Sequence, residues 1–166
     1  TESLSQTYAS WTEDSFPGGL GNITAGRIAN RLNLGGANCI VDAACASSLG
    51  AIRMAIQDLQ LGQSDLVISG GTDANMGIFA FMCFSKTPAL SPTGDCRPFS
   101  DQPDGTLLGE GIGMIALRRL ADAERDGDRI YAVVRGIGAS SDGLARSIYA
   151  PLAEGQALAI QRAYEN

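Results

Sequence analysis

A cysteine that follows a short apolar run and opens a helical pattern constrains this chain more than any other feature. The apolar run extends over residues 39–44, and Cys45 stands directly after it. Beyond Cys45, apolar side chains recur at three- and four-residue intervals, which places them on one face of a helix. These side chains are Leu49, Ile52, Ala55, Ile56 and Leu59. The pattern predicts a strand, a tight turn and a helix, with the cysteine at the start of the helix.

Cys45 is therefore the candidate nucleophile. A thiol at a helix start lies near the positive end of the helix dipole and near backbone N–H groups that have no helical partner. Both favour the thiolate, which is the reactive form of cysteine. The arrangement is mechanically similar to the nucleophile elbow of the α/β-hydrolases, without the glycines of that motif. The alternative is an unreactive cysteine that serves as a small buried hydrophobe.

The composition predicts a globular protein and excludes several kinds of partner. Of the 166 residues, 45% are hydrophobic and 18% are charged. A net charge of −6 argues against a nucleic-acid partner, and no basic cluster suggests binding to a membrane surface. The apolar runs are far shorter than the roughly 18 to 20 residues that a spanning helix needs. We expect a cytoplasmic protein.

The cysteine spacing predicts neither a metal site nor a disulfide framework. The four cysteines show no C-x-x-C spacing, and the chain contains no histidine. A disulfide framework is also not expected for a chain of this size and setting. Because the chain does not begin with Met and both ends fall within structured patterns, we expect a piece of a larger domain.

Before residue 70 the pattern predicts two further elements around the nucleophile helix. Residues 16–19 are expected to form a turn, and a helix is expected from its N-cap Asn22 to Leu32, where Gly35 and Gly36 stop it. Residues 65–69 form a short β-branched run typical of a buried strand, which residues 70–73 should end. The order strand, helix, strand predicts a parallel unit.

The second half of the chain predicts a helix, a strand, a loop and a final helix. Residues 79–84 contain three phenylalanines and a methionine and fit a core segment. A short charged helix is expected at residues 120–127, a strand at 130–134 and a glycine-serine loop at 136–143. A helix should close the chain at residues 154–164. Its predicted apolar face holds Ala157, Ile160 and Tyr164.

Lys86 and Glu110 have side chains that can act in catalysis, but no surrounding motif supports such a role for either residue. Lys86 is the only lysine of the chain, but a Ser-Lys pair alone does not indicate a catalytic amine. Glu110 lies in a glycine-rich stretch and could act as a general base by type. That stretch fits neither Gly-x-Gly-x-x-Gly after a strand nor the P-loop spacing, which argues against a nucleotide loop.

The residues around Cys45 read Asp-Ala-Ala-Cys-Ala-Ser-Ser-Leu, which resembles the active-site motif of the β-ketoacyl synthases. Further along, Phe-Ser-Lys-Thr and Pro-x-Gly-Asp-Cys-Arg-Pro-Phe resemble the family's segment along the acyl pocket and dimer contact. Gly-Glu-Gly-x-Gly resembles the stretch in which backbones pack closely behind the nucleophile. Within the family, Ser-Ile-Tyr-Ala-Pro at residues 147–151 and the Phe-Ser-Lys-Thr stretch look most like ketosynthases of multidomain polyunsaturated-fatty-acid and glycolipid synthases.

The resemblance implies an α/β protein with the thiolase-like fold, layered α-β-α-β-α, that is normally a homodimer. Residues 1–166 would be a central portion: the end of the first half, with the nucleophile, and the start of the second. Cys45 would accept an acyl chain from an acyl carrier protein, and a decarboxylated malonyl thioester would attack it. No cofactor would bind directly, since phosphopantetheine of the carrier holds the substrates. Glu110 would have a structural role.

The chain departs from the family pattern in one respect that matters for activity. Decarboxylation in the family needs two histidines downstream of the nucleophile, and this chain has none. We therefore expect these residues alone not to condense substrates. Two alternatives stay open: a non-catalytic module such as a chain-length factor, and another acyltransferase with the thiolase fold.

Overall fold

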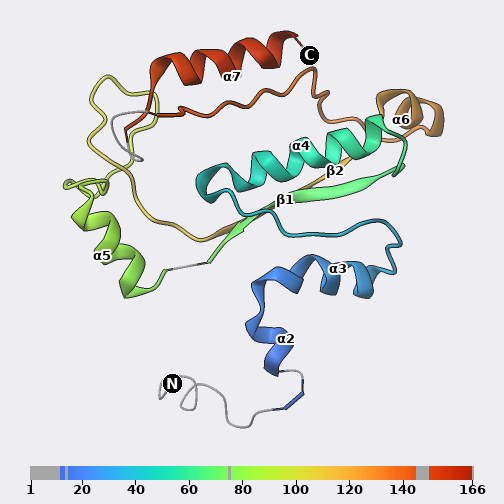
Figure 1. The fold of residues 1–166 in the computed structure, drawn as a ribbon, viewed down its shortest axis with the longest axis horizontal. Coiled ribbons are helices and arrows are strands. Elements are labelled where there is room, and N and C mark those ends of the chain that lie inside the picture. The colour runs from blue at the N-terminus through green and yellow to red at the C-terminus, as the bar shows by residue number, and fades with distance from the viewer. Residues whose placement is uncertain (1–11, 14, 75, 145–149, 166) are drawn as a thin grey trace. The chain divides into compact units, whose positions relative to one another are not determined.

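The structure is a computed structural model that describes residues 12–13, 15–74, 76–144 and 150–165. The chain forms two compact units, which divide between Leu117 and Arg118. Figure 1 shows their helices and strands in chain order. The first unit contains α2 (Ser15–Gly19), η1 (Gly21–Ile23), α3 (Thr24–Leu32), η2 (Ala44–Ala46), α4 (Ser47–Gln60), β1 (Val67–Asp73), α5 (Ile78–Lys86) and β2 (Gly111–Leu117), and the second contains α6 (Leu120–Asp126) and α7 (Ala153–Glu165).

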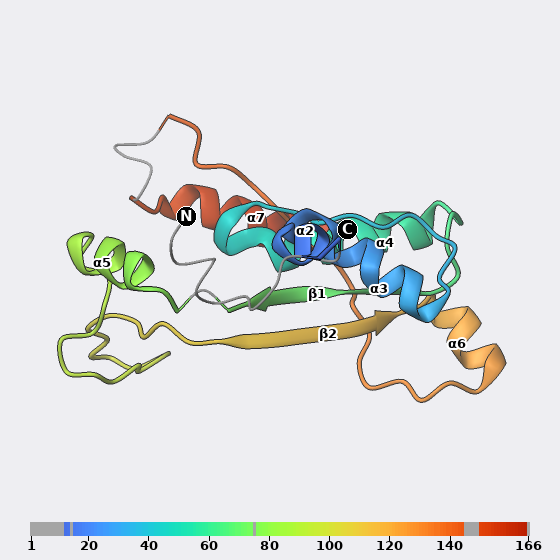
Figure 2. The same ribbon diagram turned by 90° about the horizontal axis from the view of Figure 1, so that it is seen from below.

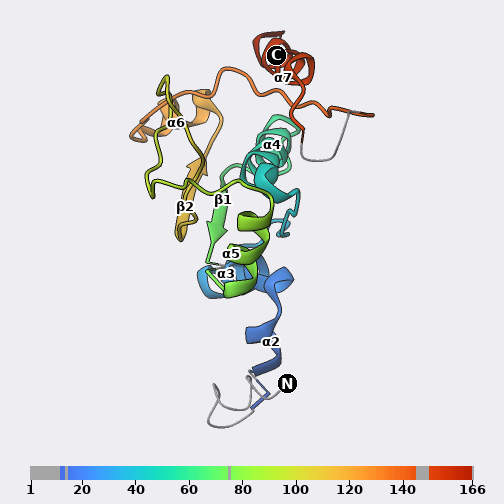
Figure 3. The ribbon, with the colours of Figure 1, turned by 90° about the vertical axis from the view of Figure 1, so that its left-hand side faces the viewer.

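A two-stranded antiparallel sheet covered by one helix is the centre of the first unit. Val67 of β1 stands opposite Leu117 of β2, and at the other end Asp73 stands opposite Gly111. Figure 2 shows the two strands side by side, with α4 on one face, and Figure 3 shows the same arrangement along the helix. Since side chains alternate along a strand, Ser69 and Gly71 share the face toward α4.

The predicted apolar face of α4 is confirmed where the helix packs and is exposed at its start. Ala55 and Leu59 are buried, each with only 5% of its surface exposed. Leu49 in the first turn remains 64% exposed. The buried part of the helix therefore lies toward its C-terminal end, and its first turn carries apolar surface that the described residues do not cover.

A close approach between the first turn of α4 and β1 sets how deeply the helix sits on the sheet. A Cβ atom built at Gly71 would lie 2.8 Å from the Cβ of Ser48, closer than real side chains approach. Opposite Gly71 on the neighbouring strand stands another glycine, Gly113. Because Gly71 has no side chain, the first turn of α4 can lie close to β1 at this point, whereas nothing lies within 4 Å of a Cβ built at Gly113.

The strand predicted before Cys45 is wrong for the described residues. Residues 37–43 form irregular chain, and of their side chains Val41 lies against α4, with its Cγ1 3.5 Å from a Cβ built at Gly50. The predicted parallel unit is therefore not formed in the described residues, because its first strand is absent, and β1 pairs instead with the later strand β2, antiparallel. Residues 70–73 do not end β1 but continue it. Glycine has a low strand propensity, but the hydrogen bonds to β2 hold these residues in the strand.

The helix predicted from Asn22 is confirmed with different ends. Asn22 lies inside the preceding η1, and the residue at the N-cap of α3 is Ile23. Asn33 ends the helix in the left-handed conformation, with φ of 52°, before the glycines are reached. Asparagine tolerates this conformation better than most residues because its short polar side chain bonds locally. Residues 16–19, expected as a turn, belong to the short helix α2.

Ion pairs surround the short helix of the second unit, which is confirmed at residues 120–126. Gly127 ends α6 with φ of 74°. Arg118 pairs with Asp126 and Asp128, while Arg119 and Arg125 both reach Asp122. The hydrogen bonds that Arg118 donates to Asp128 and then to Asp126 raise the pKa of its guanidinium. The predicted charged, solvated face is therefore a network in which opposite charges bind one another.

The final helix is confirmed as α7, but its packed side is not the predicted one. Gly155 is buried and Ala159 and Ala163 are half-buried, whereas Ile160 and Tyr164 are exposed. A Cβ at Gly138 would collide with the backbone of Ala159, so the loop before the helix runs directly along this side of small residues. The predicted strand at residues 130–134 is wrong, since the structure assigns these residues no strand. Residues 136–143 form the predicted loop.

The segment between α5 and β2 is a hydrogen-bonded loop. Its ends meet at the bridge between Leu90 and Thr106. Asp104 accepts hydrogen bonds from Thr93 Oγ1 at 2.6 Å, and its Oδ2 lies 2.6 Å from Arg97 Nη2. Hydrogen bonds from Thr93, then Arg97 and Ser91, lower the pKa of Asp104 to about 2. The loop is thus held together from within by an ionised carboxylate.

None of the helices in the described residues has the length and hydropathy that crossing a membrane requires.

We predict that Gly71→Ala lowers the free energy of unfolding of the complete protein by about 1 to 3 kcal/mol, because a methyl group would force α4 off the sheet. Gly113→Ala is the matched control: it makes the same change on the paired residue, where no described atom lies within 4 Å of a new Cβ. Denaturant unfolding measures both. Equal losses in the two variants would contradict the close approach.

We also predict an acid-dependent contribution from Asp104. Its pKa in the fold is about 2 and its ordinary value is 3.8, so the stabilisation is present above pH 4 and is lost as the pH falls toward 2. Thr93→Val removes the largest cause of the shift. The difference in unfolding free energy between this variant and the parent should therefore shrink as the pH falls through that range. Thr106→Val is the control, and a difference that is constant with pH would refute the prediction.

Candidate functional site

Cys45 lies at the start of the helix, as predicted. It is the middle residue of η2, which leads directly into α4, so its backbone belongs to the first turn of one continuous helical segment. Cys45 is exposed and unpaired, as are Cys39, Cys83 and Cys96. Its thiol is therefore accessible to a reagent or an acyl donor, and exposure alone does not distinguish it from the other three.

The residue before Cys45 has an uncommon backbone conformation. Ala44 has φ of 48°, in the left-handed region that side chains other than glycine rarely adopt. For alanine this conformation costs about 1 to 2 kcal/mol, because Cβ crowds the following carbonyl oxygen. The chain thus makes its sharp change of direction one residue before the cysteine, which is the tight turn that the sequence predicted.

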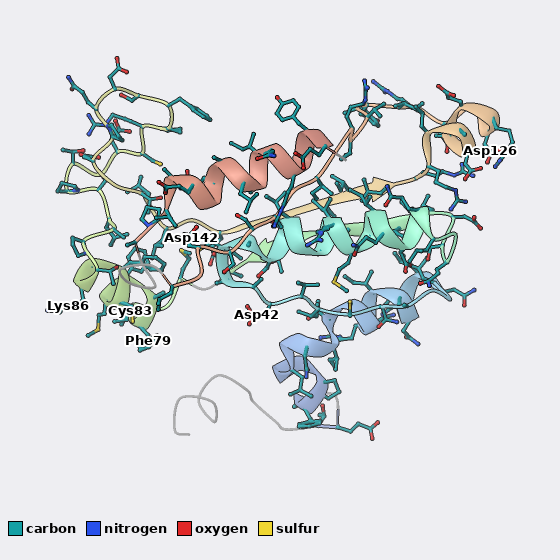
Figure 4. The ribbon with its side chains drawn as sticks, turned by 45° about the horizontal axis from the view of Figure 1, so that its top comes forward. Asp42, Phe79, Cys83, Lys86, Asp126 and Asp142 are labelled. Carbon is teal, nitrogen blue, oxygen red and sulfur yellow. The ribbon has the colours of Figure 1, made fainter. Side chains whose placement is uncertain are left out.

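Two side chains hold this turn. Asp42 Oδ1 accepts a hydrogen bond from the Ala44 N–H at 3.2 Å. Ser47 Oγ accepts one from the Ala43 N–H at 2.9 Å and donates one to the Ala44 carbonyl at 2.6 Å. Figure 4 shows Asp42 beside the chain that enters α4.

The sequence analysis did not identify Asp42 and Ser47 as part of the site. A signal was present, because aspartate two residues before a turn N–H and serine at a helix start commonly bond to nearby backbone groups. The left-handed conformation of Ala44 had no such signal, since alanine is not a residue that predicts it.

The electrostatics of the turn favour a nucleophile at Cys45. The N-terminal end of η2 and α4 carries the partial positive charge of the helix dipole. The N–H groups of a first turn have no acceptor within the helix, and that of Cys45 is one of them. A thiolate here could attack a carbonyl carbon while the adjacent N–H donates to the oxygen that becomes negative.

The other candidate residues occupy different places. Glu110 directly precedes β2, whose first residue Gly111 pairs with Asp73 at the end of β1 that Ser48 covers. Glu110 therefore lies at the same end of the sheet as the nucleophile turn. Lys86 is the last residue of α5, and Figure 4 shows it on that helix with Phe79 and Cys83. Phe79 is 80% exposed, so the prediction that this segment is core is wrong for the described chain.

No group of three or more metal-ligating side chains comes together among the residues that the structure describes. Of the Ser-Ile-Tyr-Ala-Pro stretch, residues 147–149 lie outside those residues.

The family comparison agrees with the motif around the turn. The model of the β-ketoacyl synthase N-terminal domain matches residues 2–123, which include Cys45, Asp42 and Ser47. The chain belongs to this family.

Curated relatives are large multidomain synthases. The chain is 49% identical over 163 residues to one subunit of the polyunsaturated fatty acid synthase of a Thraustochytrium species, covering 98% of the chain and 6% of the relative. It is 47% identical over 131 residues to one subunit of the phenolphthiocerol/phthiocerol polyketide synthase of Mycobacterium tuberculosis, covering 79% and 7%. The chain thus spans a small part of the relatives it matches.

Solved ketosynthases share its fold. The ketosynthase from module 6 of the Bacillus subtilis bacillaene synthase matches with a TM-score of 0.81 and 37% identity, over 86% of this chain and 26% of that one. The oxazolomycin ketosynthase domain of Streptomyces albus matches with a TM-score of 0.84 and 29% identity, over 99% and 28%. The chain is therefore an α/β protein with part of the thiolase-like fold, as predicted.

We predict opposite tolerances for two substitutions of Ala44. Ala44→Gly should leave the free energy of unfolding within about 1 kcal/mol of the parent, since relief of the left-handed strain offsets glycine's greater freedom when unfolded. Ala44→Val should lower it by about 2 kcal/mol, because a branched side chain fits this conformation worse than alanine. Denaturant unfolding of the complete protein measures both. Equal stability of the two variants would show that Ala44 is not left-handed in solution.

Proposed function

We propose that the chain is part of a β-ketoacyl synthase in which Cys45 accepts the growing acyl chain. The observation that carries the proposal is the position of Cys45: exposed, one residue after a left-handed turn and at the start of a helix. This position lies within the residues that match the family. The names of the relatives support elongation of fatty-acid or polyketide chains as the setting.

The first step of the proposed reaction is acyl transfer. The Cys45 thiolate attacks the carbonyl carbon of an acyl thioester on an acyl carrier protein, and the negative oxygen accepts a hydrogen bond from the Cys45 N–H. The intermediate collapses as the phosphopantetheine sulfur of the carrier leaves as a thiolate, which then takes up a proton from water. The acyl chain is then held on Cys45 as a new thioester, and no cofactor bound to the chain takes part.

The second step forms the carbon–carbon bond. A malonyl carrier thioester loses carbon dioxide, and the electron pair of the broken bond becomes a carbanion. The carbanion attacks the Cys45 thioester carbonyl, and the Cys45 thiolate leaves as the β-ketoacyl product forms on the carrier. The family relies on histidines for the decarboxylation, and this chain contains none. We therefore propose that these 166 residues accept an acyl group without condensing it.

The same resemblance supports two further parts of the proposal. The partners are the acyl carrier protein with its acyl and malonyl thioesters, and the complete domain is a homodimer. Location in the cytoplasm stays a prediction from the sequence. A non-catalytic chain-length factor is disfavoured because such subunits typically replace the nucleophile, whereas Cys45 is present.

We predict that an acyl N-acetylcysteamine thioester acylates Cys45 of the complete protein. Peptide mass mapping should find the added acyl mass on the Cys45 peptide, because only this cysteine combines exposure with a helix start. Cys45→Ala should abolish the adduct and any β-ketoacyl product. Cys83→Ala is the matched control, since Cys83 is also exposed but lies within α5, and it should keep both.

Two results would refute the proposal. One is acylation that persists in Cys45→Ala at the parent rate. The other is Cys45 alkylation near neutral pH that is no faster than that of Cys39 or Cys83. A β-ketoacyl product from residues 1–166 alone, above the Cys45→Ala background, would refute the proposal that these residues cannot condense.

A further inference from the structure

We propose that Asp42 and Ser47 are positioning residues for Cys45. Their hydrogen bonds hold Ala44 in the left-handed conformation that presents the Cys45 thiol and N–H at the helix start. The inference rests on the proposed role of Cys45 as acyl acceptor and names the side chains that keep the acceptor in place.

Asp42 fixes the chain as it enters the turn. Its Oδ1 accepts from the Ala44 N–H at 3.2 Å, which forms a turn closed by a side chain instead of a backbone carbonyl. The Ala44 N–H is the first donor of η2 and has no acceptor within that helix. Asp42 therefore satisfies a donor and sets the direction of the backbone with one bond.

Ser47 fixes the chain as it leaves the turn. Its hydroxyl accepts from the Ala43 N–H at 2.9 Å and donates to the Ala44 carbonyl at 2.6 Å. A hydroxyl can do both at once because it carries one donor and two acceptor positions. Since Ser47 is also the first residue of α4, these bonds tie the turn to the helix that Gly71 seats on the sheet.

Ala44 needs such support because alanine disfavours the left-handed region. A conformation of this kind persists only where surrounding contacts determine it. If the turn relaxed to an ordinary conformation, the peptide between Ala44 and Cys45 would rotate. Both the direction of the Cys45 N–H and the position of its thiol would then change, although neither Asp42 nor Ser47 need touch the substrate.

The test is the rate at which iodoacetamide alkylates Cys45 in the complete protein, read by peptide mass mapping. Asp42→Ala and Ser47→Ala should each lower the alkylation rate of Cys45 by about 5- to 10-fold. A change of this size corresponds to the loss of one hydrogen bond or somewhat more. The rates of Cys39 and Cys83 in the same samples should not change. Asp42→Asn and Ser47→Thr keep the bonding oxygens and should retain the parent rate within about twofold.

Ser48→Ala is the matched control, because it removes a neighbouring hydroxyl and keeps the Cβ that rests on Gly71. It should leave the Cys45 rate unchanged. A double variant tests whether Asp42 acts through Ala44. Glycine adopts the left-handed conformation freely. In the Ala44→Gly background, Asp42→Ala should therefore lower the alkylation rate of Cys45 by only about twofold.

Three outcomes would overturn the proposal. Unchanged Cys45 rates in Asp42→Ala and Ser47→Ala would show that the bonds do not position the thiol. An equal change in the alkylation rates of all the cysteines would indicate a general change in folding. A loss in Asp42→Asn as large as in Asp42→Ala would assign the effect to charge. Failure of the proposed function is separate, since it shows as a slow Cys45 or an absent acyl adduct in the parent.

Discussion

The contact between Ser48 of α4 and Gly71 of β1 is the constraint on which the arrangement of the first unit depends. It joins the helix that begins at the candidate nucleophile to the strand that runs beneath it. The absence of a side chain at Gly71 lets the helix approach the strand closely. The turn that carries Cys45 is therefore fixed in two ways. Its own hydrogen bonds hold it, and Ser48, three residues after Cys45, packs on Gly71 of β1.

Outside this contact the described residues bury little apolar surface. The buried apolar side chains are Ala29, Ala55, Leu59 and Ala123. The sheet face turned away from α4 exposes Ile68, Ile112 and Met114. Exposed apolar surface of this extent is unusual for a protein that folds alone. The chain also spans only about a quarter of the ketosynthases that it matches. Covering this surface would take contacts beyond those that these residues make with one another.

The difference between local and distant contacts explains which parts of the fold could be predicted from the sequence. The helices α4, α6 and α7 were predicted closely because their hydrogen bonds are local and their periodicity is visible in the sequence. The strands expected at residues 39–44 and 130–134 were not found, because a strand exists only where a partner pairs with it. The site shows the same division. The position of Cys45 at a helix start was predicted from a pattern, whereas the hydrogen bonds of Asp42 and Ser47 accompany a backbone conformation of Ala44 that no pattern indicated.

The register of the sheet has a consequence for how this family can diversify. Because Asp73 stands opposite Gly111, the intervening segment leaves the sheet and returns to it at neighbouring points. The entropic cost of bringing the two ends of such a segment together grows slowly with its length. Insertions or deletions in this segment leave the pairing of β1 with β2 and the contact of Ser48 with Gly71 unchanged. The segment between β1 and β2 can therefore vary in length while the turn that holds Cys45 stays constant.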